Sequence, residues 1–394
     1  MLQRVNGNPW LADIEAGLDG LIGQLAATAV ERDHAGGHAA REKELVRASG
    51  LLLLAVPRSS GGVGAPWPTI LHIVRRIARV DSAIAHLLAF QHLQLSGVLA
   101  YGSAEQQQRL LRETVAGNLW WGNTANPADP RLVAREEPGG YVLDGVKGFC
   151  SGARGSHKLI TTALLDGQLL IGVLTTDAAG ITIQDDWDPV GQRQTDSTSV
   201  TFSGVRLARQ DVLLAPGAPS SPFLSLRGVL AQLILVNLYL GLAEGAVEEA
   251  RNYTLTQSRP WAASGVARAA DDPYIVHRYA ELHLNNRAAA TLADEAARVF
   301  ETAWLQGTAL DAGARGEAAL AAAEAKVFAH RAALAAGEGA FDVSGARSAR
   351  AGLGLDRFWR NARTHTLHDP IDYKLRDIGR WALERRLPEP TLYS

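Results

Sequence analysis

The sequence predicts an α+β fold in three parts: an N-terminal helical domain, a middle β-barrel or sandwich, and a C-terminal four-helix bundle. Three observations predict it. Apolar residues first recur at helical spacing, short β-type segments bounded by turn residues follow, and long Ala- and Leu-rich segments complete the chain. We expect domains at residues 1–118, 119–222 and 223–394.

The N-terminal domain is predicted from its apolar periodicity. Leu and Ile residues between positions 11 and 25 fall at helical spacing, and residues 81–99 form an apolar run too long for a strand. Between them, Gly61-Gly62-Val63-Gly64 favours a turn, because Gly clusters usually mark turns. A phosphate-binding loop is a poor alternative, since no strand clearly precedes the glycines and no Gly-Lys-Ser/Thr follows them.

The middle domain is predicted from short β-type segments at 141–143, 158–162, 169–175, 181–183 and 199–202. The pair Asp144-Gly145 favours a hairpin turn. Roughly 95 residues of short strands are typical of a small barrel or sandwich. The Pro-, Ser- and Gly-rich segment 215–222 is a predicted linker to the C-terminal domain.

The C-terminal domain is predicted from four long helical segments near 223–258, 274–308, 317–341 and 375–386. Helices of this length can form a bundle, whose crevices suit cofactors. No internal repeat is visible.

Composition excludes several classes of protein. The chain has 394 residues with one Cys and one Met, which excludes a disulfide scaffold, a Cys-based metal site and a CxxC redox pair. A net charge of −2 without a strong basic cluster argues against a nucleic-acid partner. The N-terminus, MLQRVNGNPW, lacks the apolar run of a signal peptide, and residues 229–243 are too short to span a bilayer. We therefore expect a cytoplasmic protein with no membrane partner.

The scarcity of sulfur has two explanations. An Ala- and Arg-rich sequence could drift low in Cys, although such drift does not explain the missing Met. Alternatively, the protein is made when sulfur is scarce, or it works beside an oxidant that would convert Met to its sulfoxide.

Several sequence strings resemble the acyl-CoA dehydrogenase fold family. They are WDPVGQRQTDS at 187–197, followed by Val200, Phe202 and Val205; GFCSG at 148–152; and the glycine loop at 61–64. Each string is short, but their order and spacing agree over nearly the whole chain. The resemblance implies the same three-part fold, and a homotetramer in which neighbouring bundles complete the flavin site.

The C-terminal region is similar to one branch of that family, the flavin-dependent sulfur-compound monooxygenases. The similarity is carried by RNARTHTLHDP at 360–370, DYK at 372–374 and SRPW at 258–261. A dehydrogenase of this fold needs a carboxylate base, and its usual Glu-Gly pair is replaced here by His368-Asp369-Pro370. Asp369 could be a displaced base, so an FAD-dependent acyl-CoA dehydrogenase remains an alternative.

This branch implies a two-component monooxygenase that uses FMNH2 and molecular oxygen through a flavin hydroperoxide. The substrate is expected to be a small organosulfur compound, with methanesulfinate, oxidised to methanesulfonate in sulfur acquisition, as the best candidate. A dibenzothiophene- or sulfone-type enzyme and a non-catalytic flavin-binding protein are also compatible with the sequence. No GxGxxG follows a strand, so an NAD(P)H:FMN reductase is expected to supply reduced flavin. Sulfur acquisition also favours scarcity as the reason for the low Cys and Met content.

Histidines are the main candidates for catalysis, because the pKa of imidazole lies near working pH. His365 and His368 are three residues apart, so a helical turn would place them on one face. By resemblance they flank the flavin. A hydrogen-bonding pair at a helix end is the plainer alternative, and a metal site has little support, so no metal is expected. The resemblance also makes His92 catalytic, although a lone His on an apolar helix is more often a core residue.

The remaining site residues are expected from the resemblance to hold flavin or substrate. Ser151 is a candidate donor to flavin N5 or to the bound peroxide, and Asn123 and Asn126 are candidate isoalloxazine contacts; strand-end and turn chemistry are their alternatives. Arginine binds anions bidentately, which suits phosphate or an anionic substrate; a solvated surface position is the alternative for each arginine. The expected cofactor ligands are Asn123, Asn126, Ser151, Arg259, Arg363 and His368, and the expected substrate contacts are Trp121, Arg278 and Phe223. Cys150 is expected to be a buried apolar residue.

Overall fold

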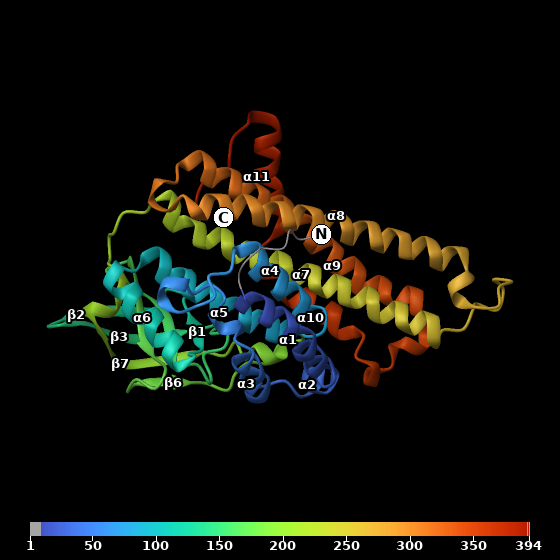
Figure 1. Ribbon diagram of the computed structural model, residues 1–394, viewed down its shortest axis with the longest axis horizontal. Helices are drawn as coiled ribbons and strands as arrows, with labels where there is room; N and C mark the ends of the chain where they lie inside the picture. Colours follow the sequence, from blue (N-terminus) through green and yellow to red (C-terminus); the bar gives the residue numbers. More distant parts are fainter. Residues whose placement is uncertain (1–8, 392, 394) are drawn as a thin grey trace.

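The computed structural model describes residues 9–391 and 393. Residues 1–8, on which the expected lack of a signal peptide depends, lie outside the described residues. Along the chain, helices are followed by a sheet and then by further helices, as Figure 1 shows. The predicted three-part α+β fold is therefore confirmed.

The N-terminal part consists of helices α1 Pro9–Ala26, α2 Ala29–Ala35, α3 Ala40–Ala48, α4 Trp67–Ala78, α5 Ser82–Tyr101 and α6 Ala104–Gly117. Helix α5 begins where the Asp81 side chain accepts a hydrogen bond from the Ile84 N–H at 3.0 Å. It is apolar on nearly every side, and such a helix is stable only inside a core. The glycine segment at 61–64 is a turn, as predicted; Gly61 has a φ of 88°.

The middle part is one mixed sheet of strands β1 Trp121–Thr124, β2 Leu132–Glu137, β3 Gly140–Lys147, β4 Lys158–Leu165, β5 Gln168–Thr175, β6 Ile181–Ile183, β7 Val200–Ala208 and β8 Val212–Leu214. The strand order is β6-β7-β3-β2-β4-β5-β8, and β1 pairs with β4 in parallel. The sheet is rolled, because Gly172 on β5 lies directly against Leu207 on β7, although the two strands are not neighbours in the sheet. This curvature gives the sheet its own apolar core.

The predicted hairpin turn at Asp144-Gly145 is wrong. Both residues lie inside β3, where the pairing with β7 shifts register between Leu143 and Gly145. Gly145 has a φ of 133°, and a Cβ at this position would lie 2.0 Å from the Arg131 carbonyl oxygen. The glycine therefore permits a β-bulge that bends the strand, which needs the same backbone freedom as a turn.

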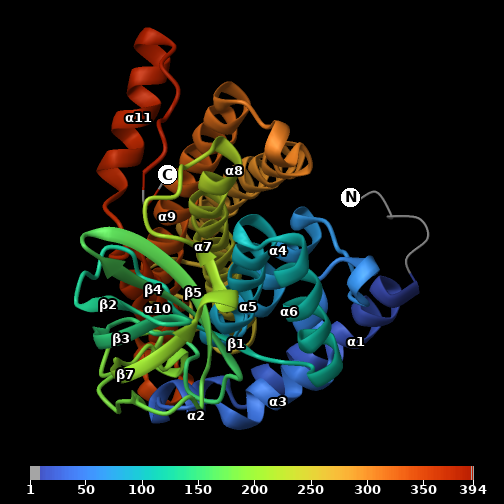
Figure 2. The ribbon, with the colours of Figure 1, turned by 90° about the vertical axis from the view of Figure 1, so that its left-hand side faces the viewer.

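The C-terminal part consists of α7 Pro222–Thr256, α8 Pro273–Leu305, α9 Ala312–Ser344, α10 Asp356–Thr366 and α11 Ile371–Glu384. Helices α7, α8 and α9 pack along one another, and the shorter α10 lies against α7 and α9. Helix α10 was not among the predicted segments. Helix α11 projects away from the rest of the protein in both views (Figures 1 and 2). Its Leu383 side chain is 86% exposed.

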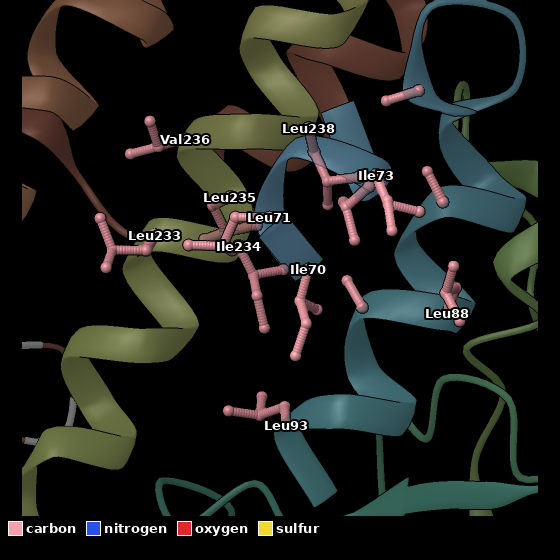
Figure 3. Close-up of a cluster of buried hydrophobic side chains, with 14 of the residues drawn as sticks. Ile70, Leu71, Ile73, Leu88, Leu93, Leu233, Ile234, Leu235, Val236 and Leu238 are labelled. Carbon is pink, nitrogen blue, oxygen red and sulfur yellow. The ribbon is translucent and has the colours of Figure 1, made fainter. Parts of the chain in front are cut away.

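The largest apolar core joins the first and last parts of the chain. Figure 3 shows side chains of α4, α5 and α7 meeting there, among them Ile70, Leu88 and Ile234. Helices α5 and α7 are long and apolar enough to cross a membrane by length and composition alone, but most of their apolar residues are buried in this core. The same core fixes the positions of α5 and α7, which also carry polar side chains.

Candidate active site

The first group of site residues lies where β1 meets α5. Asn123 on β1 accepts a hydrogen bond from Gln94 Nε2 on α5 at 3.3 Å, and its own Nδ2 donates to the Phe149 carbonyl oxygen at 3.3 Å. The Asn123 backbone N–H donates to the Ser151 carbonyl oxygen at 3.1 Å. Asn123 and Ser151, two of the predicted flavin contacts, are therefore neighbours on adjacent backbone segments.

Phe149 gives this group an exposed aromatic face. It adopts a left-handed conformation with a φ of 58°, its side chain is 66% exposed, and its ring meets the Trp187 ring edge-on at 6.1 Å. An exposed aromatic ring beside buried polar side chains is suited to stacking on a planar ligand that also forms hydrogen bonds. We name Asn123, Phe149 and Ser151 the platform.

A chain of hydroxyl and amide groups links the platform to the helices. Ser151 Oγ lies 2.7 Å from Ser197 Oγ, which lies 2.8 Å from Thr195 Oγ1. Thr195 in turn donates to the Gln192 carbonyl oxygen. The Gln192 side chain donates to Ser82 Oγ at 2.9 Å, and its backbone N–H donates to Asn361 Oδ1 at 2.5 Å.

The helices reached by Gln192 carry two stacked histidines. Ser82 lies one turn before His86 on α5, and Asn361 lies one turn before His365 on α10. The rings of His86 and His365 are 4.9 Å apart and tilted by 26°. Both nitrogens of His86 and Nδ1 of His365 are buried without a hydrogen-bond partner in the described chain.

Burial keeps the stacked pair neutral. It lowers the pKa of His86 to about 3, and the nearby His368 adds to the shift. It also lowers the pKa of His365 well below its ordinary value, with further contributions from His86 and His368. Tyr239 on α7 fixes the backbone beneath this pair, since its hydroxyl donates to the His365 carbonyl oxygen at 2.9 Å.

His368 lies just beyond the end of α10 and is held by a buried ion pair. Its Nδ1 is 2.9 Å from Asp369 Oδ1, and Asp369 also pairs with Lys326 of α9. Burial alone would raise the pKa of Asp369, but the hydrogen bond to His368 and the charge of Lys326 hold it well below its ordinary value. An ionised Asp369 can only accept, so Nδ1 of His368 carries the hydrogen. The Tyr393 ring packs edge-on against His368 at 5.6 Å.

Other predicted site residues have local contacts of their own. His92 is fully buried in α5, and burial lowers its pKa to about 3. Asn126 forms a local turn by accepting from the Ala128 N–H at 3.1 Å. Trp121 is 2% exposed and donates from its indole to Thr114 Oγ1. The Phe223 ring packs on the Trp304 ring at 5.1 Å.

The three predicted anion-binding arginines have different surroundings. Arg278 forms an exposed ion pair with Asp342, Arg259 is exposed, and Arg363 is partly buried near His330. Cys150 is buried, as expected, and burial raises the pKa of its thiol to about 12. Within the described residues, no three His, Cys, Asp or Glu side chains gather closely enough to hold a metal ion.

Sequence reasoning missed several residues that the structure places at this site. His86, Gln94 and Lys326 had no motif, and Arg227, which donates to Gln94 Oε1 at 3.1 Å, was not among the arginines considered. The one available signal for His86 was its spacing six residues before His92. Because α5 is apolar on nearly every side, that spacing does not tell which histidine faces α10.

Two family models match the chain. The acyl-CoA dehydrogenase N-terminal domain matches residues 22–118, and the acyl-CoA dehydrogenase C-terminal domain matches residues 233–373. Among curated relatives, a probable FMNH2-dependent monooxygenase, SfnC of Pseudomonas putida, is 45% identical over 377 residues, which is 95% of each chain. Dibenzothiophene monooxygenase of Rhodococcus erythropolis is 42% identical over 392 residues, covering 95% of this chain and 94% of the relative.

Solved structures agree with these matches. Methanesulfinate monooxygenase MsuC from Pseudomonas fluorescens superposes with a TM-score of 0.94 at 44% identity and full coverage of both chains. FMN-bound TdsC from Paenibacillus sp. A11-2 superposes with a TM-score of 0.93 at 35% identity, covering 97% of this chain and 100% of TdsC.

Proposed function

The chain belongs to the acyl-CoA dehydrogenase family, and from this membership we propose that it is an FMNH2-dependent monooxygenase that oxidises a small organosulfur compound. Methanesulfinate, oxidised to methanesulfonate, is the proposed substrate. The observation that carries the proposal is the pairing of an aromatic and polar platform at Asn123, Phe149 and Ser151 with histidines on α10 and just after it. That pairing supplies a surface for a flavin ring and groups that handle protons.

The residues present fit reduced FMN. Phe149 offers an exposed ring for stacking, while Asn123 and Ser151 offer polar groups for the edge of the isoalloxazine. The unpartnered nitrogens of His86 and His365 are further evidence for a polar ligand, because buried polar atoms are rarely left without a partner. Reduced FMN, when bound, supplies two electrons and activates molecular oxygen.

The proposed reaction converts FMNH2, O2 and methanesulfinate into FMN, methanesulfonate and water. Sulfur loses two electrons and gains one oxygen atom, and the second oxygen atom leaves as water. That departure requires a proton, and His368 is the proposed group that delivers it, because Asp369 fixes the imidazole with Nε2 free to exchange a proton. The stacked His86 and His365, held neutral by burial, provide hydrogen bonds without adding charge to the site.

The contacts of the Asp369 carboxylate disfavour the dehydrogenase alternative. A base that removes a proton from a thioester substrate needs a free carboxylate near the flavin. Asp369 is 7% exposed and is already bound by Lys326 and His368. Its lowered pKa makes Asp369 a weak base. This position therefore offers no suitable base for the family's dehydrogenase reaction.

The proposed partners follow from the use of free FMNH2. An NAD(P)H:FMN reductase supplies the reduced flavin, which diffuses to this protein. We place the protein in the cytoplasm, where NAD(P)H is available, and assign it a homotetrameric state. The exposed surface of α11 supports an assembly of several copies.

Purified protein tests this function. We expect a protein without tightly bound FAD that consumes oxygen when reduced FMN is supplied and forms methanesulfonate from methanesulfinate, measured by ion chromatography. Protein that arrives yellow with FAD, and that bleaches on addition of an acyl-CoA under nitrogen, would overturn the proposal.

Replacing His368 with Ala should uncouple oxygen use from product formation. Without a placed proton donor, oxygen is released as hydrogen peroxide, so we expect at least about a tenfold drop in product per O2 consumed. An oxygen electrode and a peroxide assay measure both quantities. His277→Ala, which changes an exposed histidine on α8, is the matched control. Equal coupling in the two variants would remove the role assigned to His368.

A further inference from the structure

Arg227, near the start of α7, has no carboxylate partner in the described chain. Its Nη2 donates to Gln94 Oε1 at 3.1 Å, while its Nε is buried without any acceptor. Burial lowers the pKa of Arg227, and the nearby Tyr101 opposes this shift. A guanidinium in such a place remains charged, because its ordinary pKa exceeds 12.

Two buried arginines, on α4 and α10, show how this fold neutralises a guanidinium. Arg75 pairs with Asp294 and also donates to Asn237, and Arg357 forms two hydrogen bonds to Glu249. An uncompensated buried charge costs several kcal/mol, which is why buried charges are normally paired. Arg227 is partly buried, but its Nε is fully buried and has no acceptor in the described chain, and an anion would supply that partner.

The position of Arg227 connects it with the platform. Gln94 accepts from Arg227 through Oε1 and donates through Nε2 to Asn123 Oδ1 at 3.3 Å. One amide side chain thus separates the guanidinium from a platform residue. On the neighbouring turn of α5, Gly97 has no side chain, and a Cβ there would approach Arg227 Nε to 3.4 Å and Ile160 to 3.1 Å. The glycine lets α5 pass close to the guanidinium.

We propose that Arg227 binds the negatively charged oxygens of the substrate, and that this enzyme selects an oxyanion such as a sulfinate over a neutral sulfur compound. The inference rests on the proposed function and deepens it by assigning the substrate class. Guanidinium matches a two-oxygen anion with parallel N–H groups. Gln94 orients the guanidinium through one end of its amide and contacts Asn123 through the other, so the anion is held beside the platform.

Arg227→Met tests the proposal, since Met keeps much of the length of the side chain and removes its charge. Calorimetric titration with methanesulfinate should show about 10- to 100-fold weaker binding, the usual effect of losing a charge-assisted hydrogen bond. Dimethyl sulfoxide has a similar heavy-atom shape without the charge, and its weak binding should not change. Arg227→Lys should recover part of the affinity. Arg251→Met, an exposed arginine on the same helix, is the matched control.

The same variant separates the substrate from the flavin phosphate, which is also an oxyanion. Affinities for FMN and riboflavin are measured by quenching of flavin fluorescence. Unchanged binding of both flavins, with sulfinate binding lost, supports the proposal. A loss of FMN affinity to the level of riboflavin, with sulfinate binding retained, overturns it and assigns Arg227 to the phosphate.

Failure of the function and failure of this inference are distinguishable. Wild-type protein that consumes no oxygen with reduced FMN contradicts the proposed function, whereas the titrations with anion and neutral analogue use no turnover. If Arg227→Met has a lowered melting temperature, the Lys variant and Arg227→Gln are titrated in its place. Sulfinate affinity equal to wild type in folded variants without the guanidinium would overturn the proposal.

Discussion

At pH 5 the protein should be less stable than at pH 8 by about 4 kcal/mol through His86 and His92 alone. Burial lowers the pKa of each to about 3 from the ordinary value of 6.5. Between these values the unfolded chain binds protons that the folded chain does not. Stability is therefore complete above pH 6.5 and is lost as the pH falls toward 3, at about 2 kcal/mol for each histidine by pH 5. His365 acts in the same direction.

Denaturant unfolding at a fixed protein concentration, repeated from pH 8 to pH 5, measures this dependence. His92→Gln removes one of the buried imidazoles and should reduce the loss at pH 5 by about 2 kcal/mol. His277→Gln changes an exposed histidine and should leave the dependence as it is in the wild type. A stability that does not change between pH 8 and pH 5 would show that the imidazoles are solvated or paired in solution.

The second large effect is expected from the ion pair between Lys326 and Asp369, the residue that holds His368. Lys326→Met leaves the Asp369 carboxylate buried with His368 as its remaining partner, and breaking a buried pair in this way costs about 3–5 kcal/mol. Burial also lowers the pKa of Lys326 to about 8, although Asp369 opposes that shift. The loss should appear as a lower denaturation midpoint at pH 7, with no change in the slope of the transition.

A double variant separates stability from function. Lys326→Met combined with Asp369→Leu removes both charges, and replacing a buried pair by apolar side chains is often neutral or stabilising. The double variant should therefore recover most of the stability that the single variant loses. It should still release peroxide, because nothing then orients His368. A double variant that is as unstable as Lys326→Met would mean that the pair is not the cause of the loss.

Much of the fold could be predicted because each of its parts has a distinct local pattern. Strand β6 matches its predicted bounds, and α7 and α8 begin within one residue of the predicted positions, at prolines preceded by the capping residues Ser221 and Asp272. Helix α10 escaped prediction because it is short and rich in charged residues. The Asp144-Gly145 pair was assigned to a turn because glycine is favoured for the same backbone freedom in a turn and in a β-bulge.

The site was less predictable because it depends on contacts between distant segments. The resemblance supplied Asn123, Ser151 and the C-terminal histidines, and the structure places them on connected elements. It indicated His92 and not His86; that His86 stacks on His365 depends on which side of α5 meets α10. The resemblance could not single out Arg227 either. What distinguishes Arg227 is the lack of a nearby carboxylate in the described fold, and the residues next to it in the sequence do not reveal this.

The projecting helix α11 has a consequence for enzyme assayed at low concentration. Pro370 alone separates Asp369 from Ile371, the first residue of α11, so whatever holds this helix also sets the position of His368. Tyr373 and Leu383 on α11 are 58% and 86% exposed, and neighbouring copies in the proposed tetramer would cover them. By mass action, dilution separates the copies. Specific activity should then fall on dilution, even though each separate chain stays folded.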